Sequence, residues 1–384
     1  MDALSERKYF ESWGRSFKVT LWLKQFKLIN RGVIFFISIF ISLIRWINIS
    51  PKNDSKILTI INLHRLGDTV FTIPAMKAII EHYSNYRIII VCYVETSPIL
   101  KLLFKDQEYI ELNKVDFVLG RRIARKTIRK RVLQLNSEII FDLTGMPNSA
   151  SLIYSSNAHT IVGMNLEYFS KIYTHFTSIR QKPHYMDMYL DVAKLIVPNN
   201  DIERIKYFPP SSIEEIRILI HPFAIRRAKE WDLNKYVEIA KELKSQYNVK
   251  IVSPKGFIKS DIIDEINNLE IEFCETNTIK DLMFEIENCT VFISNDSGPV
   301  YIASLLGKAT FTIYGPTNPK YSLPYGKHHR FVQYKINCSP EEERVCFTYA
   351  GIFCPSYECM ENLNVEFVKK EIISFIDNLL TKEA

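Results

Sequence analysis

Two kinds of segment alternate along most of this chain, and that alternation limits the fold more than any other feature. From Lys56 onward, short runs rich in Ile, Val, Leu and Phe are separated by amphipathic stretches. Such alternation predicts parallel sheets with helices on both faces. The predicted strands are Ile57–Asn62, Arg87–Cys92, Glu138–Leu143, Thr160–Gly163, Ile216–Ile220, Lys250–Ser253, Val291–Ser294 and Thr310–Tyr314. The predicted helices are Ala75–Tyr83, Arg121–Leu135, Tyr185–Ile196, Leu233–Tyr247, Ile279–Glu287 and Pro299–Leu306.

The pattern runs twice, with a break near Pro198–Ser212 that is rich in Pro, Asn and Ser. A chain of 384 residues is long enough for two domains. We therefore predict an α/β protein with two Rossmann-like domains, residues 55–200 and 213–384, joined by a linker at 201–212 and preceded by an extension at 1–54. Ligands of such sheets bind beyond the carboxyl ends of the strands, which predicts a site in a cleft between the domains.

The extension carries the most hydrophobic run of the chain, VIFFISIFISLI at Val33–Ile44. As a helix this run is about 18 Å long, well short of a hydrocarbon core of ~30 Å. Just upstream, residues 19–31 place Val, Trp, Leu, Phe and Ile at helical spacing, with Lys and Arg on another face. We expect an interfacial membrane anchor. A helix packed on the domain core and a true transmembrane span are the alternatives.

The formal net charge of +6 is unevenly spread. Residues 121–131 (RRIARKTIRKR) carry seven cations in eleven positions. We expect Arg121, Arg122 and Arg125 to contact a phosphorylated ligand or anionic lipid, with a solvated helix face as the alternative. Neither aromatic interleaving nor a recognised module supports nucleic-acid binding, so no nucleic-acid partner is predicted.

Seven cysteines, an odd number, argue against the disulfide framework of a secreted protein and for a reducing compartment. No secretory signal peptide is evident at the N-terminus. Cys338, Cys346, Cys354 and Cys359 have the spacing C-x7-C-x7-C-x4-C, without the C-x2-C pair typical of zinc sites. Reduced thiols are the favoured interpretation, with a structural metal or a disulfide as alternatives.

The first loop with candidate chemistry follows the first predicted strand. Gly67 is expected to turn the chain sharply, with a helix opening near Pro74. Asp68 then lies at the carboxyl end of the strand, where a helix cap is its alternative role. We take His64, Arg65 and Gly67 as candidate ligand-binding residues. The chain contains neither G-x-G-x-x-G nor G-x-x-x-x-G-K-[ST], so a P-loop NTPase is not expected.

A second loop, N-D-S-G-P at residues 295–299, follows the predicted strand Val291–Ser294. Gly298 leaves room for a ligand at the N-terminus of a helix, which is a ready anion site. This predicts a diphosphate beside Ser297 and Gly298, and a well-capped helix without a ligand is the alternative.

A third loop, HPFAIRRAKEW, begins at His221 and ends at Trp231. It places Arg226, Arg227 and Lys229 within four residues at the carboxyl end of a strand. A cation there can neutralise a phosphate leaving group. The alternative is a solvated loop in which Trp231 is a packing anchor.

In this order and spacing, L-G-D-T-V-F-T-I-P-A-M, H-P…K-x-W and N-D-S-G-P…A-S-L-L-G-K-A-T…Y-G-P-T resemble glycosyltransferase family 9, the bacterial lipopolysaccharide heptosyltransferases. The resemblance covers about residues 56–375. It implies a GT-B fold, an inverting mechanism and a nucleotide-sugar donor, commonly ADP-heptose. It also implies Asp68 as general base, Lys229 on the diphosphate, and a donor site at Asp296, Ser297 and Gly298.

The chain departs from the family pattern in two places. Tyr301 stands where His is common, and the segment after the predicted strand near Ser253 lacks an acidic residue that some members place on the donor ribose. Further donor-binding candidates are His221, Arg226, Tyr314 and Gly315. Because the resemblance implies that the N-terminal domain binds the acceptor, the acceptor-binding candidates are His64, Arg65, Gly67, Arg121, Arg122 and Arg125.

Displacing a diphosphate from an anomeric carbon needs a base, positive charge on the leaving group and in-line alignment. Asp68, Lys229 and the Ser297–Gly298 amides can supply one each, so no metal and no cofactor are predicted beyond the nucleotide-sugar co-substrate.

We predict an inverting transfer of heptose, or a similar sugar, from an ADP-sugar to a lipopolysaccharide core or related glycolipid. The expected location is cytoplasmic, peripherally attached to the inner membrane, with the oligomeric state left open. A non-catalytic nucleotide-sugar or glycan-binding protein and another GT-B enzyme, such as a nucleotide-sugar epimerase, are the alternatives.

Overall fold

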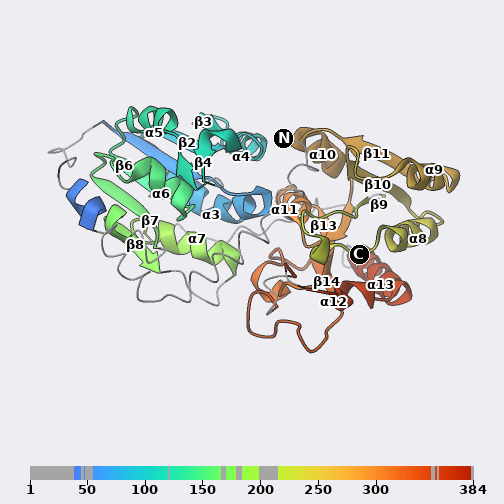
Figure 1. Cartoon of the computed structure of the whole chain (residues 1–384). Coiled ribbons are helices and arrows are strands. Elements are labelled where there is room, and N and C mark those ends of the chain that lie inside the picture. The colour runs from blue at the N-terminus through green and yellow to red at the C-terminus, as the bar shows by residue number, and fades with distance from the viewer. Residues whose placement is uncertain are drawn as a thin grey trace. The chain divides into compact units, whose positions relative to one another are not determined.

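The computed structural model describes residues 39–44, 47, 55–119, 122–165, 170–178, 184–198, 215–346, 351–352 and 354–381. The chain divides into two compact units (Figure 1). The described residues 39–198 belong to the N-terminal unit and the described residues 215–381 to the C-terminal unit. The predicted linker at 201–212, most of the predicted extension at 1–54, and Arg121 lie outside the described residues.

The N-terminal unit is built on one six-stranded sheet in the order β3-β2-β1-β6-β7-β8, and every neighbouring pair is parallel. Its strands are β1 (Ile57–Asn62), β2 (Arg87–Tyr93), β3 (Glu108–Leu112), β6 (Ile139–Asp142), β7 (Thr160–Asn165) and β8 (His175–Ser178). A small antiparallel hairpin pairs β4 (Phe117–Val118) with β5 (Ile123–Ala124). The helices are α3 (Leu66–His82), α4 (Ser97–Leu103), α5 (Lys126–Leu133), α6 (Pro147–Ile153) and α7 (Tyr185–Ala193), with short turns η1 (Lys114–Asp116) and η2 (Ser170–Ile172).

The C-terminal unit has a second parallel six-stranded sheet in the order β11-β10-β9-β12-β13-β14. Its strands are β9 (Arg217–His221), β10 (Asn248–Pro254), β11 (Glu272–Thr276), β12 (Val291–Asn295), β13 (Ala309–Tyr314) and β14 (His329–Gln333). The helices are α8 (Leu233–Leu243), α9 (Ser260–Asn268), α10 (Ile279–Glu287), α11 (Gly298–Leu305), α12 (Glu358–Glu361) and α13 (Val365–Thr381), with short turns η4 (Arg227–Lys229) and η5 (Pro319–Tyr321).

The two sheets share one topology. Numbered within each sheet, the strands run 3-2-1-4-5-6, the doubly wound order of a Rossmann fold. The predicted fold class is therefore confirmed. The order reverses between β1 and β6 in one sheet and between β9 and β12 in the other, and ligands of such sheets bind at the carboxyl ends beside this switch.

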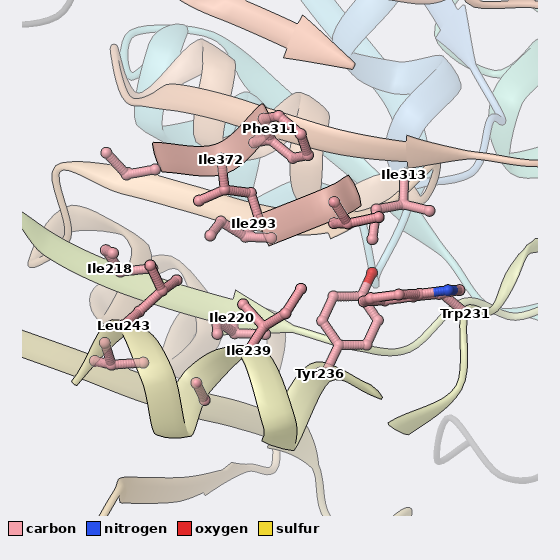
Figure 2. Close-up of a cluster of buried hydrophobic side chains, with 14 of the residues drawn as sticks. Ile218, Ile220, Trp231, Tyr236, Ile239, Leu243, Ile293, Phe311, Ile313 and Ile372 are labelled. Carbon is pink, nitrogen blue, oxygen red and sulfur yellow. The ribbon is translucent and has the colours of Figure 1, made fainter. Parts of the chain in front are cut away.

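The inner strands form the sheets because nearly every side chain on them is buried and most are apolar, as sheets covered on both faces require. Figure 2 shows the core of the C-terminal unit, where side chains on one face of β9, β12 and β13 pack against α8 and α13. The labelled residues are Ile218, Ile220, Trp231, Tyr236, Ile239, Leu243, Ile293, Phe311, Ile313 and Ile372.

Helical residues 39–44 belong to the predicted membrane-facing run. Ile41 is buried in the same hydrophobic cluster as Ile61 of β1, so part of the run packs on the domain core. On the same short helix, Phe40 is 60% exposed and Leu43 is 57% exposed. No helix in the described part of the chain is long and apolar enough to cross a membrane.

Two predicted helix starts are wrong. Helix α3 begins at Leu66, not near Pro74, which lies inside the helix. Gly67 is therefore helical and is absent from the positive-φ residues of the described chain, so it makes no sharp turn. An acidic residue in the first turn, Asp68, favours the earlier start through the helix dipole.

The basic segment is not a single helix from residue 121. The hairpin β4–β5 occupies its first part, and α5 begins only at Lys126. Ala124 is buried, which fixes the hairpin on the domain, and Leu119 adopts a left-handed conformation (φ 50°) beside the turn. The helical periodicity of the sequence was thus overridden by tertiary packing.

Candidate active site

The loop that carries Lys229 is fixed by an asparagine at the end of β12. The Asn295 side chain donates from Nδ2 to the Pro222 carbonyl at 2.8 Å. Its Oδ1 accepts the Trp231 backbone N–H at 3.0 Å and the Tyr236 hydroxyl at 2.9 Å. Trp231 is only 1% exposed and meets Tyr236 edge-on (Figure 2). Both ends of the loop are thereby held, and Lys229 is placed between the two anchors.

Lys229 and Asp296, two predicted site residues, form an ion pair. Lys229 Nζ lies 2.5 Å from Asp296 Oδ2, and its side chain is 20% exposed against 4% for Asp296. The same carboxylate accepts the hydroxyl of Thr317 on Oδ2 and that of Tyr301 on Oδ1, both at 2.5 Å. The four side chains come from the loops after β9, β12 and β13 and from α11, so they gather at the carboxyl edge of the sheet.

The electrostatics of this cluster decide its charge state. Burial, the largest influence, raises the pKa of Asp296, but the Lys229 charge and the three hydrogen bonds together leave that pKa below its usual value. Burial and the neighbouring carboxylate hold the pKa of Tyr301 well above its ordinary value. At neutral pH the cluster is therefore a carboxylate, a cation and two hydroxyl donors.

Helix α11 begins beside this cluster. Ser297 is its N-cap residue, and the Ser297 hydroxyl is buried with no hydrogen-bond partner in the described chain. Gly298 and Pro299 form the first turn. An unpartnered hydroxyl at a helix N-terminus, next to a lysine, is an arrangement that suits an anion.

The other predicted loop lies in the N-terminal unit. Asp68 is half-buried in the first turn of α3, and within the described residues nothing hydrogen-bonds or pairs with its carboxylate. Arg65, which is exposed, is the N-cap residue, so Asp68 does not cap the helix. His64 is buried, with Nε2 2.8 Å from the Leu143 carbonyl and its ring edge-on to Tyr189.

Three predicted donor-binding residues lie in closely packed surroundings. His221 is 4% exposed and stacks on Phe292, and burial lowers its pKa to about 4, so it is neutral. Tyr314 is fully buried, with its hydroxyl 3.2 Å from the Ser322 hydroxyl. A Cβ on Gly315 would lie 2.5 Å from Met360 Sδ, so close packing explains that glycine. Arg226, by contrast, is partly exposed three residues before Lys229.

Sequence reasoning missed three residues of the Asp296 arrangement and one buried carboxyl of the N-terminal unit. Asn295 and Thr317 lie inside the quoted motifs but were given no role, and Tyr301 was noted only as a departure from the family. Asp142 was overlooked because it stands alone in an apolar run. It is fully buried at the end of β6, opposite Ile61 of β1.

The predicted acceptor-side cations lie on and beside the β4–β5 hairpin. Arg122 and Arg125 are both exposed, and Arg125 Nε donates to the Val115 carbonyl at 2.8 Å. The apolar side chains of Leu119 and Ile123, which are 72% and 44% exposed, accompany them. This surface is therefore basic and apolar at once.

Comparison with known proteins gives consistent relatives. The chain is 24% identical to lipooligosaccharide heptosyltransferase 2 of Campylobacter jejuni over 80% of this chain and 95% of that protein. Its fold is similar to the E. coli ADP-heptose lipopolysaccharide heptosyltransferase II (TM-score 0.62, 17% identity, 85% of this chain and 99% of that one). It is also similar to a dodecameric iron-containing heptosyltransferase, TibC, in complex with ADP-D-β-D-heptose (TM-score 0.52, 13% identity, 86% and 78%). The model of glycosyltransferase family 9 (heptosyltransferase) matches residues 125–350, more than half of the chain, and this protein belongs to that family.

Proposed function

We propose that this protein transfers a heptose from ADP-heptose to a lipopolysaccharide core or a related glycolipid, with inversion at the anomeric carbon. The observation that carries the proposal is the Lys229–Asp296 ion pair beside the N-terminus of α11. Family membership supports the reaction class, and the named substrates of the relatives support the donor and the acceptor.

The donor diphosphate binds at the start of α11 in this proposal. The unpartnered Ser297 hydroxyl and the first-turn backbone meet one phosphate, while Lys229 shares its charge between Asp296 and the diphosphate. Because Asp296 stays ionised, its carboxylate holds the Lys229 ammonium in one position. Charge that grows on the departing ADP then meets a fixed cation and a helix dipole.

Asp68 serves as the general base. Its carboxylate has no competing partner in the described chain, so it can accept the proton of an acceptor hydroxyl. The acceptor oxygen forms a bond to the anomeric carbon while the bond from that carbon to the diphosphate oxygen breaks. The proton goes to Asp68 and the electron pair leaves with ADP, which gives inversion in one step. Cationic and dipolar groups of the chain stabilise the leaving group, so the transfer itself is proposed to proceed without a metal ion.

The acceptor side of the proposal includes a membrane. Lipopolysaccharide precursors are anionic glycolipids, and exposed Arg122, Arg125 and Lys126 offer the opposite charge. Exposed Leu119 and Phe40 add apolar contact of the kind that peripheral proteins use at lipid surfaces. We propose peripheral attachment to the cytoplasmic face of the inner membrane.

The decisive experiment is a transfer assay with ADP-heptose and a truncated core glycolipid. Asp68→Asn should lower kcat by ~10²–10⁴-fold while ADP-heptose still raises the melting temperature of the variant. Lys229→Met should weaken the donor-induced melting shift as well as slow transfer. Glu81→Gln, at an exposed position of α3, and Lys241→Met, at an exposed position of α8, are matched controls that should behave like wild type.

Two results would contradict the proposal. Near wild-type turnover in Asp68→Asn would remove Asp68 as the base. A donor-induced melting shift without transfer to any core acceptor would instead favour a non-catalytic nucleotide-sugar-binding protein.

A further inference from the structure

Strands β1 and β6 part at their carboxyl ends, and side chains take over the hydrogen bonds there. The Leu143 N–H still donates to the Ile61 carbonyl at 3.0 Å. In a continued parallel ladder, the next bond would join the Leu63 N–H to the Leu143 carbonyl. Instead, the Leu63 N–H donates to the Thr144 hydroxyl oxygen at 2.8 Å. The Leu143 carbonyl lies 2.8 Å from His64 Nε2. The strands therefore separate while both backbone groups keep a partner.

The two side chains that replace the ladder are themselves buried and held in place. The Thr144 hydroxyl also donates to the Ile61 carbonyl at 3.4 Å, so it acts as donor and acceptor at once. A carbonyl oxygen only accepts, so His64 Nε2 carries the hydrogen that it donates. The His64 ring meets Tyr189 of α7 edge-on, with the ring centroids 5.1 Å apart. A buried backbone group without a partner costs free energy, so neither bond is easily given up.

The loop after β6 gives Thr144 a firm support. Asp142 Oδ1 accepts the backbone N–H groups of Thr144 and Gly145, both at 3.0 Å. Gly145 has a φ of 60°, and a Cβ there would lie 2.9 Å from Met164 Cβ. Only glycine accepts both that conformation and that close approach. The loop is thus fixed by its own contacts, and it presents the Thr144 hydroxyl to the chain that leaves β1.

The residues held in this way lead directly into the helix that carries Asp68. Only Arg65, Leu66 and Gly67 lie between His64 and Asp68. Helix α3 begins at Leu66, and in the described chain its N-cap residue Arg65 makes no side-chain capping hydrogen bond. Packing on α7 fixes the body of α3, but its first turn depends on the chain that precedes it. The two side-chain bonds therefore act at the end of the helix where Asp68 lies.

We propose that the Thr144 hydroxyl and the His64 ring position the Asp68 carboxylate for proton transfer. They hold the chain after β1 away from the ladder and so set where the first turn of α3 lies. A general base must reach the acceptor hydroxyl within hydrogen-bond distance, and a displacement of ~1 Å can cost up to ~10²-fold in rate. This inference rests on the proposed function, in which Asp68 is the base. Thr144 and His64 act through Asp68 and are positioning residues.

The test measures single-turnover transfer from ADP-heptose to a truncated core glycolipid, which separates the chemical step from product release. In Thr144→Val, the Leu63 N–H loses its acceptor and competes with the His64 ring for the Leu143 carbonyl. The transfer rate should fall ~10-fold, while ADP-heptose still raises the melting temperature as in wild type. Thr144→Ser keeps the hydroxyl and should restore most of the rate. His64→Phe keeps a ring beside Tyr189 and should slow transfer to a similar extent, which covers a Thr144→Val chain that folds poorly.

A matched control and a double variant separate positioning from general damage. The Thr174 hydroxyl accepts the Ile161 N–H at 2.9 Å, as Thr144 does for Leu63, but at the amino ends of β7 and β8. Thr174→Val should therefore transfer at the wild-type rate. Adding Thr144→Val to Asp68→Asn should slow transfer by less than ~2-fold, because the displaced group is no longer a base. Damage unrelated to Asp68 would instead multiply the two effects.

The inference is overturned if Thr144→Val and His64→Phe transfer at the wild-type rate, or if Thr144→Ser is as slow as Thr144→Val. It is equally overturned if Thr144→Val costs the same factor in the Asp68→Asn chain as in wild type, or if Thr174→Val is as slow as Thr144→Val. Each of these results leaves Asp68 as the base. Near wild-type transfer in Asp68→Asn would instead contradict the proposed function, and this inference with it.

Discussion

The fourth strand of each sheet ends beside a buried aspartate, and the two aspartates have opposite electrostatic surroundings. Asp142, at the end of β6, accepts the Tyr173 hydroxyl at 2.7 Å and the Ser149 hydroxyl at 2.8 Å. Asp296, directly after β12, likewise accepts one tyrosine and one hydroxyl residue, Tyr301 and Thr317. The remaining donors differ: two backbone N–H groups at 3.0 Å for Asp142, but the Lys229 ammonium for Asp296.

This single difference changes the charge that each site can hold. Burial raises the pKa of Asp142, and neutral donors only partly oppose that effect. The pKa of Asp296 is instead lowered, because a cation is added to a similar set of hydroxyls. The same topological position therefore holds a structural carboxyl in one unit and, in the other, a fixed negative charge that orients a lysine. In the proposed function, only the second holds a lysine for a phosphate.

The largest expected effect comes from removing the cation that distinguishes the two sites. Lys229→Met should lower the free energy of unfolding by about 3 kcal/mol, because it leaves the buried Asp296 charge unpaired. Urea denaturation measures the loss. The double variant Lys229→Met/Asp296→Asn should recover most of it, since no uncompensated charge remains. A double variant no more stable than Lys229→Met would show that the pair does not behave as an ion pair.

The two sheets also teach what sequence can reveal about a doubly wound fold. All eight predicted strands exist, and they are the inner strands of the two sheets. The strands that were missed at the sheet edges are β3, β8, β11 and β14. Inner strands are buried on both faces and appear as continuous apolar runs, whereas β3 and β11 alternate or are half-exposed. A strand can thus be recognised in the sequence only when it is buried enough to require a run of apolar residues.

The candidate site was visible to a different extent in the two units. In the C-terminal unit, the predicted Lys229 and Asp296 prove to be in contact, because the motifs that carry them follow adjacent strands. In the N-terminal unit, Asp142 gave no signal, since its partner Tyr173 lies 31 residues away and is identified only by the folded chain. His221 is buried, which its position after a strand did not reveal, because the sequence alone gives no sign of whether such a histidine faces the core or a ligand.

Each sheet has a glycine near the end of its fifth strand, Gly163 in β7 and Gly315 after β13. These two glycines offer the next test of the comparison between the two units. A Cβ on Gly163 would lie 2.3 Å from the ring of Tyr173, the tyrosine that donates to Asp142. A Cβ on Gly315 would lie 2.5 Å from Met360 Sδ, the end of a flexible side chain. Gly163→Ala should cost about 2 kcal/mol of stability by displacing a rigid ring, and Gly315→Ala clearly less. Thermal unfolding of the two variants decides it, and an equal or larger loss in Gly315→Ala would contradict the ranking.

Removing the hydroxyl of Tyr301 or of Tyr173 should change the free energy of unfolding by a smaller amount. Tyr301→Phe removes a hydrogen bond to a charged carboxylate and should cost about 1.5 kcal/mol, whereas Tyr173→Phe removes one from a carboxyl with a raised pKa and should cost about 1 kcal/mol. Each variant keeps the ring, so packing is matched between them. Urea midpoints at neutral pH give the comparison. A greater loss in Tyr173→Phe would mean that Asp142 holds the stronger charge.

The smallest effect is expected in the pH dependence, where the two aspartates should act in opposite directions. A lowered pKa means that Asp296 contributes stability above the unfolded value of ~3.9, which is lost as the pH falls through its folded pKa. A raised pKa means that Asp142 contributes stability below pH ~3.9, which is lost as the pH rises through its folded pKa.

Urea denaturation of wild type, Asp296→Asn and Asp142→Asn at a series of pH values separates the two contributions. Relative to wild type, Asp296→Asn should lose less stability on acidification and Asp142→Asn should lose more, by at most ~1.4 kcal/mol per pH unit for one proton. Parallel curves for the two variants would mean that the lysine does not distinguish the two strand ends.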